Sequence, residues 1–157
     1  MPGTVLVTGG FGLVGSATVR RLAELGRTVV IADLDSPANR KAATQLPPGV
    51  TVHWVDLTNV EQTARLVADV APAVIIHLAA IIPPAIYKNR ALARRVNVDA
   101  TATLVGIAEA QPTPPRFVQA SSNAVFGARN PHRATGPVTA DMPMKHSDLY
   151  SAHKAEA

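Results

Sequence analysis

Five short apolar runs, separated by segments with helical periodicity, constrain the fold of this chain more than any other feature of its sequence. β-Branched runs that alternate with amphipathic helices are typical of βαβ units, in which helices cover both faces of a parallel sheet. Crossovers in such units are right-handed, so the sequence predicts an α/β fold with a doubly wound parallel sheet of strand order 3-2-1-4-5. We expect one domain over residues 1–157. The strands are expected at 4–7, 28–32, 50–55, 73–78 and 116–120, and the helices at 13–25, 37–45, 58–70, 92–110 and from about Ser147 onward.

Local signals mark the helix ends. Ser36 and Pro37 are typical of an N-cap followed by a first-turn proline. Thr58, with Glu61 three residues later, is typical of a capping box and predicts Thr58 as the N-cap of the third helix. Gly26 stands where a helix C-terminal glycine belongs.

The composition excludes several classes of protein. Hydrophobic residues make up 47% of the chain and charged residues 17%, which is not the composition of a disordered protein. The lack of Cys excludes a disulfide framework, a zinc–thiolate site and a thiol nucleophile. No histidine pair stands at metal-ligand spacing, so we expect no metal site, and a structural role for His77.

Charge and apolar patterning argue against nucleic-acid and membrane partners. The net charge is +4, but the 15 Lys and Arg residues are scattered, whereas nucleic-acid binding needs a dense basic patch. The longest apolar stretch, 73–86, is interrupted by a histidine and two prolines and falls short of the ~20 residues that span a bilayer. The first apolar run, 5–7, is too short for a signal-peptide core. We therefore expect a soluble, cytoplasmic protein.

The strongest local signal is the segment Thr8-Gly9-Gly10-Phe11-Gly12-Leu13-Val14-Gly15, which follows the first strand and opens the first helix. In that context, Gly9 permits a tight turn, Gly12 lets the backbone approach a pyrophosphate, and Gly15 lets the helix pack on the strand. The glycine pattern thus predicts a Rossmann-type dinucleotide site. A glycine turn without a ligand is the alternative.

The first helix supplies the other half of this expected phosphate site. Free N–H groups at its N-terminus, around Leu13 and Val14, and the positive end of its dipole would face the phosphates. A Walker loop requires Lys after its last glycine, and Ser16 stands there instead. The sequence therefore argues against an NTPase.

Two acidic residues follow the second and third strands. Asp33, 18 residues after Gly15, is placed to accept hydrogen bonds from ribose hydroxyls and to repel a 2′-phosphate, which favours NAD over NADP as the cofactor. Asp33 as a turn former is the alternative. Asp56 and Leu57 are placed to hold an adenine ring; an N-cap acid ahead of Thr58 is the alternative at that site.

Tyr150 and Lys154 stand four residues apart on one face of the last predicted helix. A cation beside a phenol favours the phenolate, so we expect Lys154 to lower the pKa of Tyr150 from ~10 and make it a usable acid or base. Ser121 and Ser122 end the fifth strand. No Gly-x-Ser-x-Gly elbow surrounds Ser122, which argues against a hydrolase.

With these motifs in hand, the whole chain resembles the extended short-chain dehydrogenase/reductases, the NAD-dependent epimerase/dehydratase family. The matching pieces occur in the family's order: Thr8 to Gly15, Asp33, Asp56-Leu57, His77-Leu78-Ala79-Ala80, Asn97-Val98 before Thr101, Ser121 to Gly127, and Tyr150 to Lys154. The resemblance implies an oxidoreductase-type enzyme that transfers a hydride between NAD and a carbinol or carbonyl carbon. Its substrate would be a nucleotide sugar, a hydroxy acid, or an alcohol or ketone, and a homodimer stays open as its assembly state.

The resemblance also implies residue roles. Tyr150 would be the catalytic acid/base, Lys154 would bind the nicotinamide ribose, and Ser122, with Ser121 as its rival, would bind the substrate oxygen. Leu78, Ala79 and Ala80 would line the cofactor groove, and Asn97 would brace the site. The alternative for Leu78, Ala79 and Ala80 is simple core packing, and the alternative for Asn97 is an ordinary amide on a helix face.

Two features depart from the family pattern. Phe126 stands where Tyr is common, and the chain ends three residues after Lys154, whereas family members are much longer. We therefore expect either a fragment of a longer enzyme or a non-catalytic dinucleotide-binding module, and little turnover from residues 1–157 alone.

Overall fold

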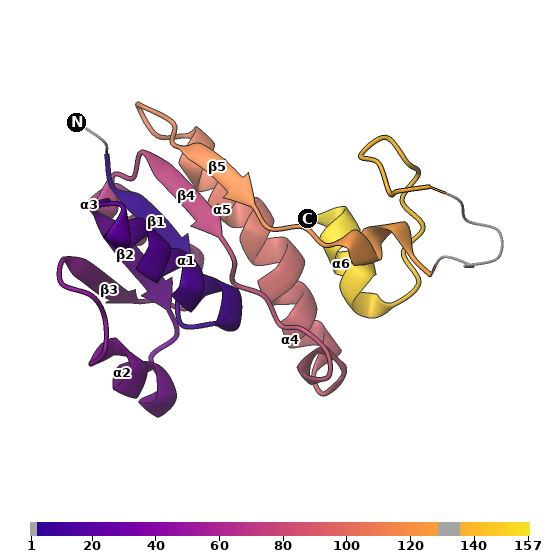
Figure 1. The fold of residues 1–157 in the computed structure, drawn as a ribbon, viewed down its shortest axis with the longest axis horizontal. Coiled ribbons are helices and arrows are strands. Elements are labelled where there is room, and N and C mark those ends of the chain that lie inside the picture. The colour runs from indigo at the N-terminus through magenta and orange to yellow at the C-terminus, as the bar shows by residue number, and fades with distance from the viewer. Residues whose placement is uncertain (1–2, 129–135) are drawn as a thin grey trace.

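The computed structural model describes residues 3–128 and 136–157, and its centre is a five-stranded parallel sheet (Figure 1). The strand order is β3-β2-β1-β4-β5, as the sequence predicts. The strands are β1 (Val5–Thr8), β2 (Val29–Asp33), β3 (Val50–Trp54), β4 (Val74–His77) and β5 (Arg116–Gln119). The α-helices are α1 (Leu13–Glu24), α2 (Pro37–Ala43), α3 (Val60–Val70), α4 (Arg90–Arg94), α5 (Ala100–Glu109) and α6 (Leu149–Glu156). Single turns of 3-10 helix lie at η1 (Ala85–Tyr87) and η3 (Asn123–Phe126), and a π-helical turn, η2 (Arg95–Asp99), joins α4 to α5.

Alternate residues of the central strands enter two separate cores. Leu6, on one face of the sheet, packs with Leu66 of α3 and Leu104 of α5. Val7, on the opposite face, packs with Val19 of α1. All four residues of β1 are buried, because helices cover both faces of the sheet and strands flank β1 on both sides. The edge strands β3 and β5 are more exposed.

Two of the predicted helix ends are confirmed. The Ser36 hydroxyl accepts a hydrogen bond from Asn39 N at 3.1 Å, with Pro37 as the first helical residue of α2. Gly26 follows the C-cap of α1 with φ +68° and donates to Ala23 O. The last helix begins at Leu149, two residues after Ser147, because Asp148 and Ser151 form a reciprocal capping box.

Two other predictions about helices are wrong. Asn59, not Thr58, is the N-cap of α3 and accepts a hydrogen bond from Gln62 N at 3.0 Å. The Thr58 hydroxyl lies in the turn ahead of the helix, where it donates to Asp56 Oδ1 at 2.8 Å. The helix expected at 92–110 is interrupted by the π-helical turn η2, which surrounds the buried Asn97. Such turns are often found at functional sites.

Part of the segment between β5 and α6, residues 129–135, lies outside the described residues. Residues 121–128 continue from the strand into η3, and Lys145 N donates to Val125 O at 2.9 Å, which ties the two described ends of this segment together. Among the helices of residues 3–128 and 136–157, none is both long and apolar enough to cross a membrane.

We expect Gly15→Ala to destabilise the fold by about 1–3 kcal/mol, the usual cost of overpacking. A Cβ at Gly15 would lie 2.1 Å from Gly9 O and 2.8 Å from Gly10 Cα, and backbone atoms cannot move aside as a flexible side chain can. Urea unfolding monitored by circular dichroism measures the change. Gly106→Ala, in the exposed part of α5 with nothing within 4 Å of its Cβ, is the control and should stabilise by about 0.5–1 kcal/mol. Equal midpoints for the two variants would contradict the packing argument.

Candidate functional site

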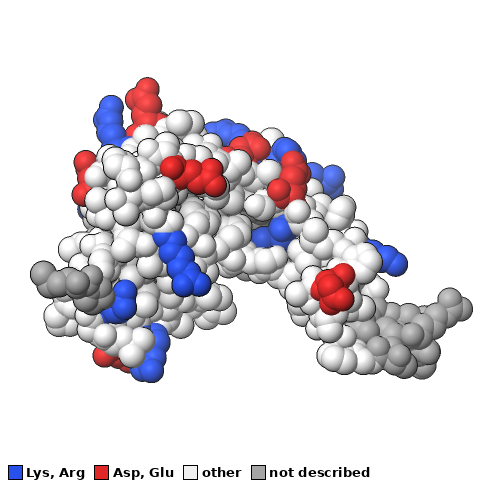
Figure 2. Space-filling view, turned by 90° about the horizontal axis from the view of Figure 1, so that it is seen from above, with Lys and Arg blue, Asp and Glu red and all other residues white. Residues whose placement is uncertain are grey.

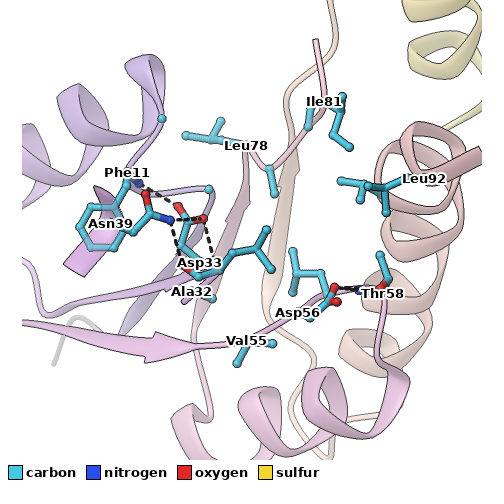
Figure 3. A pocket seen from close by; sticks show the side chains of 17 residues that line it. Phe11, Ala32, Asp33, Asn39, Val55, Asp56, Thr58, Leu78, Ile81 and Leu92 are labelled. Atoms are coloured by element: carbon cyan, nitrogen blue, oxygen red, sulfur yellow. Dashed lines mark hydrogen bonds between the residues drawn. The ribbon is translucent and has the colours of Figure 1, made fainter. Parts of the chain in front are cut away.

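A cavity of about 480 Å³ opens at the carboxyl ends of β1, β2, β3 and β4 (Figure 3). It lies where the strand order reverses between β1 and β4, the usual ligand position in an open parallel sheet. Its volume is in the range of small-molecule and cofactor sites. The cavity is lined by Gly9, Phe11, Gly12, Ala32, Asp33, Leu34, Asn39, Val55, Asp56, Leu57, Thr58, Leu78, Ala79, Ala80, Ile81, Leu92 and Val96.

Gly9 and Gly12 of the glycine turn both line this cavity, but only Gly12 has side-chain space that the protein leaves largely open. At three of the glycines, protein atoms already occupy the space that a side chain would need. A Cβ would lie 2.7 Å from Ala79 at Gly9, 2.6 Å from Ile31 at Gly10, and 2.1 Å from Gly9 O at Gly15. At Gly12, the near neighbour of a Cβ is Gly9 O at 3.2 Å, and Gly12 lines the cavity. Packing therefore accounts for Gly9, Gly10 and Gly15, whereas Gly12 leaves room for a ligand to approach the backbone.

The beginning of α1 is open to an anion. Its N-cap is Gly12, so no side chain caps the first N–H groups, and no acidic residue stands in the first turn. The side chains of Leu13 and Val14 are 91% and 63% exposed and lie outside the cavity lining. Any contact of these two residues with a phosphate in the cavity would have to come from the backbone N–H groups.

Asp33 lies at the end of β2, where it joins the glycine turn to the start of α2. Its Oδ2 accepts from Phe11 N at 3.0 Å, and its Oδ1 accepts from Leu34 N at 2.8 Å and from Asn39 Nδ2 at 3.3 Å (Figure 3). Asp33 therefore shapes the turn and also presents its carboxylate to the cavity. Sequence patterns did not reveal Asn39, which lines the same wall through its place in the first turn of α2.

An aromatic stack borders this wall. The rings of Phe11 and Trp54 are stacked with their centres 5.6 Å apart, and the Arg40 guanidinium lies 5.3 Å from the centre of the Trp54 ring. Arg40 also binds both carboxylate oxygens of Asp35, at 2.6 and 2.7 Å. The first arginine that follows Asp33 in the sequence is therefore already paired with a carboxylate.

Asp56 and Leu57 line the part of the cavity at the end of β3. Asp56 Oδ1 accepts from Thr58 N at 2.9 Å and from the Thr58 hydroxyl at 2.8 Å, which makes a turn ahead of α3. The N-cap alternative for Asp56 is wrong, because Asn59 has that role. Leu92 and Val96 face this region from α4 and η2, and only the tertiary fold brings them there.

His77 holds the end of β4 and is structural, as the sequence predicts. It is buried, with Nδ1 2.6 Å from Thr8 Oγ1 and Nε2 3.0 Å from Thr101 Oγ1. Burial, aided by the positive charge of Lys154, lowers the pKa of His77 to about 4. Thr8 Oγ1 also accepts from Leu78 N and Ala79 N at 3.3 Å, which fixes the strand end that lines the cavity. Across residues 3–128 and 136–157, no three His, Asp or Glu side chains form a metal-binding group.

Asn97 is buried in η2 and supports the cavity wall from behind. Its Oδ1 accepts from Ile81 N at 2.7 Å and its Nδ2 donates to Ile81 O at 2.8 Å. Ile81 lines the cavity, whereas Asn97 does not. The residue therefore braces the segment after β4 rather than touching the space inside it.

Helix α6 lies beyond the carboxyl end of β5 (Figure 1). Ser122 is the N-cap of η3, Tyr150 and Lys154 are on α6, and none of the three lines the cavity. Lys154 Nζ donates to Ala120 O at 2.7 Å and lies 6.0 Å from the centre of the Tyr150 ring. Ser122 Oγ accepts from Ala124 N at 3.2 Å. In the described part of the chain, no hydrogen bond joins Ser122 to Tyr150.

The expected lowering of the phenol pKa is wrong for this structure. Partial burial, together with the negative charge of Asp148, raises the pKa of Tyr150 above its usual value. Burial lowers the pKa of Lys154, and its ammonium group points to a backbone carbonyl. The i, i+4 spacing put Tyr150 and Lys154 on one helix face, but burial and the neighbouring carboxylate decide the direction of the shift.

The fold and the cavity define a class: a doubly wound α/β protein with a glycine turn and an open helix N-terminus at its switch point. The chain belongs to the NAD dependent epimerase/dehydratase family, whose family model matches residues 5–157.

Known relatives agree with this membership. The chain is 34% identical to a 3-beta-hydroxysteroid dehydrogenase of Mycolicibacterium neoaurum, over 99% of this chain and 41% of that protein. It is 28% identical to a UDP-glucose 4-epimerase of Dictyostelium discoideum, over 96% of this chain and 44% of that protein. The structure of a Thermus thermophilus UDP-glucose 4-epimerase in complex with NAD matches with a TM-score of 0.83 and 27% identity, covering 97% of this chain and 47% of that one. The chain thus spans less than half the length of these relatives.

We expect the free energy of unfolding to fall by about 3 kcal/mol between pH 6.5 and pH 4 because of His77 alone. The folded-state pKa is lowered, so the unfolded chain binds the extra proton below pH 6.5 and the stabilisation is lost as the pH falls toward 4. Urea unfolding of the unmodified chain and of His77→Gln, at several pH values, measures this. The variant should show a flatter dependence in this range, whereas an identical dependence would contradict the assignment.

Proposed function

We propose that this chain binds NAD in the cavity and is the cofactor-binding part of an enzyme that transfers a hydride between NAD and a carbinol or carbonyl carbon. The observation that carries the proposal is the pairing of Gly12, whose side-chain space opens into the cavity, with the Asp33 carboxylate on the next strand end. Solved relatives in complex with NAD support this choice of cofactor.

The residues present fit a dinucleotide. The pyrophosphate would lie over Gly12, held by the backbone N–H groups at the start of α1, around Leu13 and Val14, with Gly9 and Gly15 keeping the turn and helix in place. The Asp33 carboxylate would accept hydrogen bonds from the ribose hydroxyls. Because Arg40 is engaged by Asp35, a 2′-phosphate would meet a carboxylate without a free cation, which favours NAD over NADP.

The remaining lining residues would hold the two rings of the cofactor. Asp56 and Leu57 border the space for adenine, and Leu78, Ala79 and Ala80 form the wall that continues from β4. Asn97 would keep that wall in place through Ile81.

Three residues would carry the chemistry beside the nicotinamide. When bound, NAD accepts or supplies the hydride. The Tyr150 hydroxyl would move the proton of the substrate oxygen, Ser122 would hydrogen-bond that oxygen, and Lys154 would bind the nicotinamide ribose. The raised pKa of Tyr150 keeps its hydroxyl protonated at neutral pH, which favours its role as a proton donor to a carbonyl oxygen.

A small molecule is the proposed substrate: a nucleotide sugar, a hydroxy acid, or an alcohol or ketone. The relatives include a UDP-glucose 4-epimerase and a 3-beta-hydroxysteroid dehydrogenase, so both polar and apolar substrates occur among them. Ile81 lines the cavity and the neighbouring Ile82 is exposed, and these apolar side chains favour a dehydrogenase or reductase.

A nucleic-acid partner is not proposed. On the face shown in Figure 2, Lys and Arg alternate with Asp and Glu rather than forming a dense basic patch. We place the protein in the cytoplasm and leave a homodimer open as its assembly state.

A non-catalytic dinucleotide-binding module is the second candidate. The observation that favours it is that Ser122, Tyr150 and Lys154 all lie outside the cavity lining.

We expect NAD to bind more tightly than NADP, and Asp33→Asn to weaken NAD binding by about 1–3 kcal/mol, the usual range for a hydrogen bond to a charged group. The substitution keeps the shape of the side chain and removes its charge, so NADP binding should weaken less or improve. Titration calorimetry measures all four affinities, and Asp69→Asn, an exposed acid on α3, is the control. Equal affinities of the unmodified chain for NAD and NADP would contradict the role of Asp33.

We expect little NAD-dependent turnover from residues 1–157 alone, and we expect Tyr150→Phe to lower that turnover by about 10²–10⁴-fold, the usual contribution of a general acid, while NAD affinity changes little. Absorbance of the reduced cofactor, recorded with representatives of the three substrate classes, measures turnover. Turnover that survives in Tyr150→Phe would exclude the proton-transfer role. NAD binding without turnover in either protein would favour the binding module.

A further inference from the structure

Three contacts attach the last turns of α6 to the rest of the fold. Lys154 Nζ donates to Ala120 O at the end of β5, and Glu156 accepts two hydrogen bonds from the Arg94 guanidinium of α4. Between them, the imidazole of His153 is 4% exposed and faces Asn97 of η2. The helix that carries Tyr150 and Lys154 is thus fixed at a strand end, at α4 and at the π-helical turn.

The orientation of the Asn97 amide follows from its backbone partners. Ile81 N is a donor, so the atom 2.7 Å away must be Oδ1; Ile81 O is an acceptor, so the atom 2.8 Å away must be Nδ2. The second hydrogen of Nδ2 is then free to point to His153 Nδ1, 3.4 Å away. Nδ1 must therefore accept, which fixes His153 as the neutral imidazole with its proton on Nε2.

From this geometry we propose that His153 is a positioning residue. By accepting the hydrogen bond of Asn97, it holds α6, and with it Tyr150 and Lys154, against the segment that walls the dinucleotide cavity at Ile81. The effect of His153 on NAD binding rests on the proposed NAD site. The attachment of α6 can be measured without a cofactor.

The same contact responds to pH. Protonated Nδ1 would place an N–H group against the N–H of Asn97, so the hydrogen bond would be lost and two donors would face each other. The charged groups that act on the imidazole are Arg94 on α4, Asp99 on η2 and Glu156 on α6. Burial, followed by Arg94, lowers the pKa of His153, while Glu156 and Asp99 oppose this shift. The contact is therefore intact at neutral pH and is lost in acid, as the pH falls through the lowered pKa of His153, which lies below the usual ~6.5.

The other two attachments of α6, through Glu156 and through Lys154, are not lost when histidine is protonated. Arg94 lowers the pKa of the Glu156 carboxyl group, so their ion pair persists when histidine titrates. Lys154 is already the charged donor to Ala120 O, and acid keeps it charged. The titration of His77 lowers the stability of the whole fold in the same pH range. The part of the loss of α6 attachment that disappears in His153→Asn therefore points to His153.

The experiment compares the unmodified chain with His153→Asn, His153→Leu and His146→Gln. Asparagine places an acceptor oxygen near the position of Nδ1 but does not titrate, leucine fills the space without an acceptor, and His146 is an exposed histidine ahead of α6 that serves as the matched control. Hydrogen-exchange protection factors of the α6 amides, measured without cofactor at about pH 7.5 and about pH 5, form the first readout. The NAD dissociation constant at the same two pH values is the second.

In the unmodified chain and in His146→Gln, we expect α6 protection and NAD affinity to fall roughly threefold to tenfold in acid, the range that corresponds to one ordinary hydrogen bond. His153→Asn should remove this threefold to tenfold part of the pH dependence and leave the part that His77 causes, and His153→Leu should lack the contribution of His153 at both pH values. If His153→Asn keeps the pH dependence of the unmodified chain, or His153→Leu keeps full α6 protection, the positioning role is overturned. If NAD fails to bind at neutral pH while α6 protection behaves as expected, the proposed function fails and the role of His153 in positioning α6 stands.

Discussion

The site depends on one close approach of backbone to backbone. Gly15 in the first turn of α1 lies so near Gly9 O that no side chain fits between them, and Gly9 in turn packs against the backbone of Ala79 after β4. These two contacts bring the start of a helix and the ends of two neighbouring strands together at one edge of the sheet. Protein atoms fill the side-chain space at Gly9 and Gly15 but leave it largely open at Gly12. The cavity therefore opens at the N-terminus of α1, which no side chain caps.

A network of buried hydrogen bonds extends this edge toward α6. His77, at the end of β4, joins β1 to the start of α5 through Thr8 and Thr101, and Asn97 joins η2 to the segment after β4 through Ile81. These are polar groups in a mainly aliphatic core, so each is stabilising only while its partners are in place. Electrostatics connects the two ends of the network as well, since the charge of Lys154 on α6 contributes to the low pKa of His77 on β4.

The sequence predicted the sheet and its strand order because the signals there are local and repeated: apolar runs for buried strands, helical periodicity between them, and a glycine turn at the first crossover. Prediction from the sequence was less successful where several side chains could play the same role. Thr58 had the right spacing from Glu61 for a capping box, but Asp56 binds its hydroxyl and Asn59 caps the helix instead. The π-helical turn around Asn97 gave no periodic signal, because it arises from a contact with Ile81, which is far away in the sequence.

The sequence by itself determined which residues end each strand at the shared edge, since period and turn chemistry are properties of short segments. The sequence therefore predicted that Gly12, Asp33, Asp56 and Leu78 are neighbours. Only the tertiary structure decided what surrounds each group: Asn39 beside Asp33, Leu92 and Val96 across from Leu57, and Asp148 near Tyr150. The pKa of Tyr150 shows the physical reason. The spacing to Lys154 fixed a partner on the same helix, but the direction of the shift depends on burial and on all charges nearby, which only the folded chain brings together.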